Sequence, residues 1–182
     1  MTIVPDLLRE QADQNPDRIA VVLDGIAEMT YGQWEADSNR LARHLVERGL
    51  QPGERVGILF PNTEALSYLR SYHAVHKAGA VVVPLNTRST ATELNRIVTH
   101  SGMVAVLAGH ECAEMANTIQ SSLCGAALLL VGEELEGSLV QGDGSTFQVP
   151  RDAEDLADIL YTSGTTGDSK GVACKHRDIT FK

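Results

Sequence analysis

The chain has 182 residues, of which 43% are hydrophobic and 21% charged, and its formal net charge is −9 at pH 7. This composition is typical of one folded domain with a real core, and it excludes extensive disorder. The negative charge disfavours a nucleic-acid-binding surface, because nucleic-acid backbones are anionic. It still permits one small anion site built from backbone amides.

The cysteines and the apolar runs indicate the compartment. Cys112, Cys124 and Cys174 are an odd number at wide spacing, without a CxxC pair. This pattern favours a reducing compartment over a disulfide framework or a zinc ribbon. The first residues lack the basic and apolar regions of a signal peptide, and no apolar run is long enough to span a membrane. We therefore expect a cytoplasmic protein.

The N-terminal third is expected to form two helices and a hairpin. Proline fits the first turn of a helix, which predicts a short helix from Pro5 to about Gln14. Apolar runs on both sides of Asp24-Gly25 predict a β-hairpin. Thr30 and Gln33 have the spacing of a capping box, and the helix that follows carries Trp34 on its apolar face. We expect Trp34 to lie in the core.

From Arg55 onward, predicted strands alternate with predicted helices. The strands are expected at 55–60, 80–84, 103–108, 126–131 and 157–161. Asn62 is placed to cap the helix after the first strand, and Thr90 with Glu93 forms a second capping box. The βαβ order predicts an α/β fold with a mostly parallel sheet flanked by helices. Residues 132–155 interrupt this alternation of strands and helices. They are expected to form a variable, acidic surface loop, with a short strand at 147–149.

The segment from Thr162 to Gly171 carries the candidate chemistry. Its glycines allow backbone N–H groups to converge, its hydroxyls add donors, and Lys170 adds a positive charge. Together they predict a polyphosphate cradle at the carboxyl end of a strand, with Thr166 facing Mg²⁺. By composition alone the segment would more often be an ordinary loop. It is not a Walker A loop, because Ser169 and Gly171 replace the glycine and the hydroxyl residue of that pattern.

The literal sequence of this segment resembles a known signature. Residues 161–172 read YTSGTTGDSKGV, which is similar to the phosphate loop of adenylate-forming enzymes. That superfamily contains acyl-CoA synthetases, peptide-synthetase adenylation domains and beetle luciferases. Met29-Thr30-Tyr31-x-x-Trp34 resembles its "LTYxEL" segment, and residues 77–86 resemble its "KAGAxxxPLN" segment. The chain departs from the pattern at Ser169, where the family usually has a proline that would stiffen the loop.

The resemblance implies a fold and an activity. Residues 1–182 would be the first part of the large N-terminal domain, truncated just after the phosphate loop at 162–171. Such enzymes join a carboxylic acid to ATP, release pyrophosphate and pass the acyl group to a thiol, usually coenzyme A. The adenylation lysine and the acyl pocket lie further downstream in the family, so no catalytic residue is expected in this chain. The residues implied to hold the β- and γ-phosphates are Thr162, Ser163, Gly164, Thr165, Thr166, Gly167 and Lys170.

Within the family, residues 86–94 look more like acyl-CoA ligases than peptide-synthetase domains. An ATP- and Mg²⁺-dependent acyl-CoA synthetase-like ligase, with a role in fatty acid metabolism, is therefore the main expectation. The chain alone is expected to be inactive and to self-associate through surface exposed by truncation. Two alternatives remain: an adenylation domain that loads a carrier protein, and a stand-alone module that binds a nucleotide or a partner without catalysis.

Several other residues are expected to be structural. His73 and His76 have a spacing on a helix that can bind metal, but no third ligand is in view, so we expect them to lie on the helix surface or to pack. Cys174, on the strand after the loop, is expected to be buried. The acidic residues from Glu133 onward are expected to form a solvated face and not a metal site.

Overall fold

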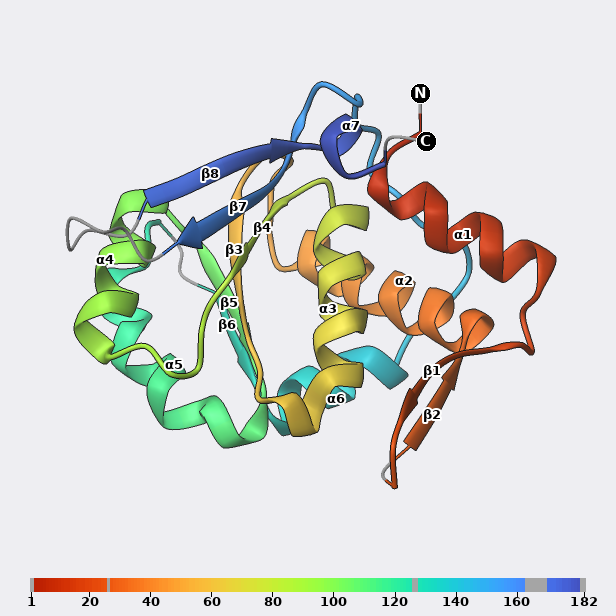
Figure 1. Ribbon diagram of the computed structural model, residues 1–182, viewed down its shortest axis with the longest axis horizontal. Coiled ribbons are helices and arrows are strands. Elements are labelled where there is room, and N and C mark those ends of the chain that lie inside the picture. The colour runs from red at the N-terminus through yellow and green to blue at the C-terminus, as the bar shows by residue number, and fades with distance from the viewer. Residues whose placement is uncertain (1, 26, 126–127, 163–169, 181–182) are drawn as a thin grey trace.

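The computed structural model describes residues 2–25, 27–125, 128–162 and 170–180, and Figure 1 shows their arrangement. The helices are α1 (Val4–Gln14), α2 (Tyr31–Glu47), α3 (Ala65–Lys77), α4 (Ala91–Ser101), α5 (Ala113–Ile119), α6 (Glu133–Val140) and α7 (His176–Ile179). The strands are β1 (Ile19–Leu23), β2 (Ala27–Thr30), β3 (Arg55–Leu59), β4 (Val81–Pro84), β5 (Ala105–Ala108), β6 (Leu128–Val131), β7 (Leu156–Thr162) and β8 (Lys170–Lys175).

A six-stranded sheet forms the centre of the protein, in the order β6-β5-β3-β4-β7-β8. Every neighbouring pair from β6 to β7 is parallel, and β8 runs antiparallel to β7 at the edge. The expected α/β fold with a mostly parallel sheet is confirmed. The inner strands β4 and β5 are apolar throughout, as expected for parallel strands with helices on both faces of the sheet.

The two faces of the sheet are covered by different helices, which are visible on either side of the strands in Figure 1. Helices α2, α3 and α6 share a hydrophobic cluster with one face. Helices α4 and α5 share a second cluster with the other face. Successive residues of β4 belong to different clusters: Val82 lies in the first and Val83 in the second. This division follows from the alternation of side chains along a strand.

The local signals of the N-terminal third are confirmed. β1 and β2 pair antiparallel around the Asp24-Gly25 turn, with Leu23 opposite Ala27. Thr30 Oγ1 accepts from the Gln33 amide at 3.2 Å, and Gln33 Oε1 accepts from the Thr30 amide at 2.9 Å. The second capping box, Thr90 with Glu93, forms in the same way at the start of α4. These contacts satisfy amides that the first helical turn leaves without partners.

The expectation of a loop over 132–155 is wrong for its first part. Residues 133–140 form α6, because Leu135 and Leu139 lie on one helical face and are buried in the cluster beneath α2. The expected strand at 147–149 does not form. Instead, Phe147 packs on the core and the Val149 amide donates to the Lys77 carbonyl at 2.7 Å. A segment rich in acidic residues thus covers one end of the sheet.

Three smaller expectations are corrected or refined. Asn62 does not cap α3; it begins a short 3₁₀ turn, and the N-cap position falls on Glu64 without a side-chain cap. Trp34 is half-buried, and its indole Nε1 donates to the Leu69 carbonyl at 3.0 Å. Cys174 is half-buried rather than buried, because β8 lies at the edge of the sheet.

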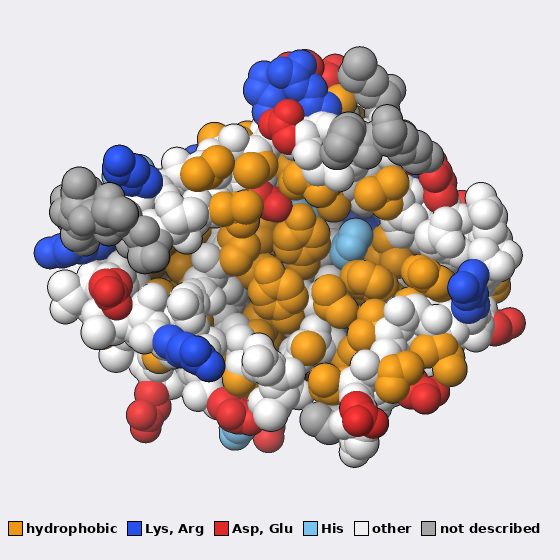
Figure 2. Space-filling model, viewed as in Figure 1, with side chains coloured by type: hydrophobic (Ala, Val, Ile, Leu, Met, Phe, Trp, Pro, Cys, Tyr) orange, Lys and Arg blue, Asp and Glu red, His pale blue; other side chains and the backbone are white. Residues whose placement is uncertain are grey.

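Hydrophobic side chains gather in the centre of the face shown in Figure 2, over the region of α3 and β7. On the hairpin of β7 and β8, Leu160 is 41% exposed and Val172 is 50% exposed. The described part of the chain thus leaves apolar surface open beside this hairpin. Among the described residues, no helix has the length and hydrophobicity needed to cross a membrane.

Candidate phosphate-binding site

The hairpin of β7 and β8 brings the two ends of the predicted phosphate loop together. β7 is parallel to β4, so its carboxyl end lies at the edge of the sheet where open α/β folds bind ligands. β8 returns antiparallel, and Thr162 is opposite Lys170 in the last register pair. Both residues are exposed. A hydroxyl and an ammonium at adjacent strand ends are suited to an anionic group such as a phosphate.

The middle of the predicted loop lies outside the described residues. This applies to five of the predicted phosphate-binding residues, including the expected magnesium ligand Thr166: Ser163, Gly164, Thr165, Thr166 and Gly167. Of the predicted set, the structure therefore places only Thr162 and Lys170. In the described part of the chain, no three His, Cys, Asp or Glu side chains are grouped to hold a metal ion.

Asp158 attaches β7 to α3 on one face of the sheet. The Tyr72 hydroxyl donates to Asp158 Oδ2 at 2.9 Å, and His76 Nε2 lies 3.1 Å from Asp158 Oδ1. The carboxyl group is buried, with 5% of the residue exposed. Burial, and then the nearby Asp158 charge, raises the pKa of Tyr72, so the phenol remains a donor. The sequence did not indicate this cluster, because Asp158 is 86 residues from Tyr72.

Tyr161 attaches β7 to α4 on the opposite face. The Tyr161 hydroxyl lies 2.7 Å from His100 Nδ1, and the two rings meet edge to face. Tyr161 directly precedes Thr162, and Gly171, its partner on β8, directly follows Lys170. The sequence gave no signal of this contact, because Tyr161 and His100 are 61 residues apart.

His73 and His76 are buried packing residues of α3, as expected from the sequence. The His73 ring meets Trp34 at 4.9 Å between centroids, and the His76 ring lies 5.4 Å from that of His176. His176 Nδ1 accepts from the Val4 amide at 3.4 Å. The histidines therefore join α1, α2, α3 and α7 beneath the hairpin.

Two of these buried histidines are expected to make folding stability depend on pH. Burial, and then the neighbouring His76, lowers the pKa of His73 to about 3 and that of His176 to about 4. Below pH 6.5 the unfolded chain binds protons that the folded chain excludes. Stability is then lost as the pH falls from about 6.5 toward these folded-state values, and unfolding at pH 5 takes up about one proton per histidine.

Urea-induced unfolding between pH 7 and pH 5 measures this effect. His176→Asn keeps an acceptor near the Nδ1 position but cannot titrate there. The slope of the unfolding free energy against pH should therefore fall by the amount that corresponds to about one proton taken up on unfolding. The exposed His110 provides the control, and His110→Gln should leave the slope unchanged. If His176→Asn leaves this pH dependence unaltered, the lowered pKa of His176 is contradicted.

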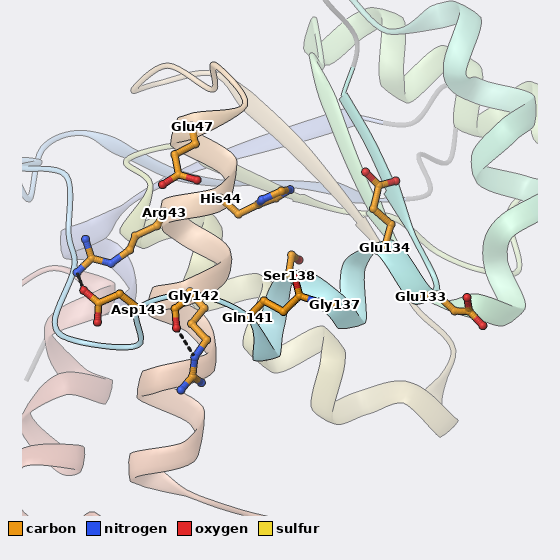
Figure 3. Close-up of a pocket in the computed structure, with 11 residues that line it drawn as sticks. Arg43, His44, Glu47, Glu133, Glu134, Gly137, Ser138, Gln141, Gly142 and Asp143 are labelled. Carbon is orange, nitrogen blue, oxygen red and sulfur yellow. Dashed lines mark hydrogen bonds and ion pairs between the residues drawn. The ribbon is translucent and has the colours of Figure 1, made fainter.

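One cavity lies away from the hairpin. It has a volume of about 720 Å³ and lies between α2 and α6, as Figure 3 shows. Its cationic side chains already have partners: Arg43 pairs with Asp143 at 3.3 Å, and Arg40 Nε donates to the Gly142 carbonyl at 3.4 Å. Three glutamates also line the cavity, namely Glu47, Glu133 and Glu134. This mixed charge does not favour a polyphosphate.

A smaller cavity of about 220 Å³ lies where β5 ends. Glu64 occupies the backbone donors there, accepting from the His110 amide at 3.0 Å and the Glu111 amide at 3.1 Å. Glu133 and Glu136 also line this cavity. Since a carboxylate already fills the anion position, the end of β5 is unsuitable for phosphate. The hairpin of β7 and β8 therefore remains the best candidate site.

Comparison with known proteins identifies the family of the chain. The model of the family described as "AMP-binding enzyme" matches residues 8–182, which is nearly the whole chain. The chain belongs to the AMP-binding enzyme family. It is 34% identical to 3-oxocholest-4-en-26-oate–CoA ligase from Rhodococcus rhodochrous, over 97% of this chain and 33% of the ligase. It is 36% identical to surfactin synthase subunit 2 from Bacillus subtilis, over 97% of this chain and 5% of that subunit.

Solved structures show the same relationship for this AMP-binding chain. The inhibitor-bound N-terminal domain of FACL13 from Mycobacterium tuberculosis is similar with a TM-score of 0.87 and 30% identity. That match covers 97% of this chain and 45% of the solved one. The fold is therefore that of the N-terminal domain of adenylate-forming enzymes. The chain spans about a third of the length of the CoA ligases that it matches.

Proposed function

We propose that residues 1–182 form the first, phosphate-binding part of an ATP-dependent carboxylate–CoA ligase. The observation that carries this proposal is the pairing of Thr162 with Lys170 at the carboxyl end of β7. The YTSGTTG sequence between β7 and β8 and the similarity to CoA ligases support it. The proposed reaction has two steps: a carboxylic acid and ATP give an acyl-adenylate and pyrophosphate, and coenzyme A then displaces AMP to form a thioester.

The proposed role of the chain is electrostatic. A carboxylate oxygen attacks the α-phosphorus of ATP, and the bond to the departing pyrophosphate breaks. Lys170, the loop hydroxyls and the loop amides would hold the β- and γ-phosphates, and Thr166 would face the Mg²⁺ that accompanies them. Such donors lower the barrier by aligning the phosphates and balancing the charge on the leaving group. We assign no catalytic residue to this chain.

An adenylation domain that loads a carrier protein is the second candidate. The 36% identity to surfactin synthase subunit 2 favours it specifically. The two candidates share the adenylation step and differ only in the thiol that accepts the acyl group. Thioester formation with coenzyme A, tested beside a phosphopantetheinyl carrier protein, distinguishes them.

Carboxylate-dependent exchange of radioactive pyrophosphate into ATP tests the adenylation step. We expect exchange in the protein that contains this chain together with the remaining two-thirds of a CoA ligase. We expect none with residues 1–182 alone, because these residues supply only the phosphate loop. Exchange by the short chain would contradict its assignment as one part of the site. Lack of exchange by the longer protein with a broad panel of carboxylic acids would favour a non-catalytic nucleotide-binding module.

We further propose that residues 1–182 in isolation self-associate through the apolar surface beside the hairpin. The exposed Leu160 and Val172 support this proposal. Exposed apolar surface of this kind typically marks a contact with another protein surface.

A further inference from the structure

The backbone holds the hairpin to the sheet at few positions. β3 has four register pairs with β4 and four with β5, whereas β7 has one register pair with β4, Val82 with Asp158. Within the described residues, β7 pairs on its other side with β8, which lies at the edge of the sheet. The position of Thr162 and Lys170 relative to the sheet therefore depends on side chains that connect β7 to the helices.

Side chains hold β7 from both faces of the sheet. Asp158 contacts Tyr72 and His76 of α3 on one face, but it lies four positions before Thr162. Tyr161 contacts His100 of α4 on the other face, and it lies directly beside Thr162. Because Tyr161 is nearer the loop, its contact has the greater control over where the loop begins.

The Tyr161–His100 contact has the geometry of a strong hydrogen bond. The oxygen and Nδ1 are 2.7 Å apart, within the normal range for such pairs. Burial raises the pKa of Tyr161, so its phenol keeps its proton. The phenol donates to His100 in the tautomer whose Nδ1 carries no hydrogen. His100 lies in the last turn of α4, whose Leu94, Ile97 and Val98 are buried in the core. The acceptor is therefore attached to a well-packed helix.

The Tyr161 ring also lies against Gly171 of β8. A Cβ atom added at Gly171 would lie 3.2 Å from Cζ of Tyr161 and 3.1 Å from Cγ2 of Ile159. The Tyr161 ring therefore lies against the Gly171 backbone, in space that any larger residue would need. Tyr161 precedes Thr162 and Gly171 follows Lys170, so one ring contacts both strands beside the two ends of the loop.

We propose that Tyr161 and His100 are a positioning pair that fixes Thr162 and Lys170 for binding the phosphates of ATP. The proposal rests on the proposed function, because it assumes that these two residues bind phosphate. Neither member of the pair is assigned a contact with ATP. The pair acts by holding the hairpin in its binding arrangement before the nucleotide arrives, which lowers the ordering cost of binding.

Kinetics of the ligase that contains this chain test the pair. Tyr161→Phe removes one oxygen and keeps the ring against Gly171. We expect it to raise the KM for ATP about 3- to 10-fold, the range of one lost hydrogen bond, and to change kcat less than 2-fold. His100→Leu should have the same effect. The double variant should be no worse than either single one, because both remove the same bond.

Two further variants separate positioning from general destabilisation. His100→Asn places an acceptor oxygen near the Nδ1 position and should restore most of the affinity for ATP. Tyr31→Phe removes a hydroxyl from α2, on the opposite face of the sheet, and should leave the KM unchanged. A lower melting temperature without a change in the KM of Tyr161→Phe would overturn the proposal, as would additive effects in the double variant.

Amide hydrogen exchange gives a readout that is independent of activity. Tyr161→Phe should speed exchange in residues 160–162 and 170–172, while the amides of β3 and β5 stay protected. Unchanged exchange in the hairpin would overturn the pair as a positioning device. If the unmodified ligase shows no pyrophosphate exchange with ATP, the proposed function fails instead, and the hydrogen-exchange result still decides whether the pair fixes the hairpin.

Discussion

Replacing Lys170 by alanine is expected to slow carboxylate-dependent pyrophosphate exchange about 10²- to 10³-fold in the ligase that contains this chain. Lys170 is the first residue of β8, opposite Thr162, and is exposed at the end of the hairpin. Its ammonium would balance charge that increases on the pyrophosphate as the α-phosphorus bond breaks. Since that interaction is strongest in the transition state, the loss should appear mainly in kcat. Initial rates over a range of ATP concentrations measure it.

Lys175 provides a matched control for Lys170. It lies at the other end of the same strand, where its ammonium pairs with Glu154 at 2.9 Å. Lys175→Ala removes the same charge from β8 and should change exchange less than about 3-fold, because an exposed ion pair contributes little. Lys170→Arg keeps the charge with a different shape and should retain partial activity. Full activity in Lys170→Ala would contradict the phosphate-binding role.

Replacing Glu35 by leucine is expected to lower the free energy of unfolding by about 3–5 kcal/mol. Glu35 Oε1 accepts from Lys77 Nζ at 2.6 Å, and both residues are buried, with Lys77 at 0% exposure. Burial lowers the pKa of Lys77 and the Glu35 charge opposes that shift, so removing Glu35 leaves a buried ammonium without its anion. This loss is a large fraction of the total stability of an ordinary domain. Urea-induced unfolding at pH 7 measures it.

A double variant shows whether the loss comes from the unpaired charge. Glu35→Leu with Lys77→Met removes both charges and keeps the volume, so it should regain most of the lost stability. The exposed pair of Arg177 and Glu154 gives the control, because solvent screens such a pair and Glu154→Ala should leave the urea midpoint almost unchanged. A double variant as unstable as Glu35→Leu would show that packing, and not charge, explains the loss.

Local signals in the sequence predicted much of the fold. The capping boxes at Thr30 and Thr90 formed as expected, because cap chemistry depends on residues three positions apart. The alternation of strands and helices after Arg55 predicted the parallel sheet. The loop expected over 132–155 was wrong at α6, where Leu135 and Leu139 became informative only against the apolar face of α2. The local pattern of a short helix such as α6, with several acidic residues, is too weak to predict that helix without its tertiary partners.

For the candidate site too, some features were predicted from local sequence and others depended on tertiary contacts. The sequence by itself identified the candidate loop, since Thr162, Lys170 and the glycines between them form one continuous string. Only the tertiary structure decided which distant polar groups meet: Tyr161, beside Thr162, contacts His100, which is 61 residues away, and Glu35 pairs with Lys77, which is 42 residues away. Turn and cap preferences are properties of neighbouring residues. The partners of a buried polar group depend instead on which faces of distant elements meet, and on the cost of leaving that group unpaired away from water.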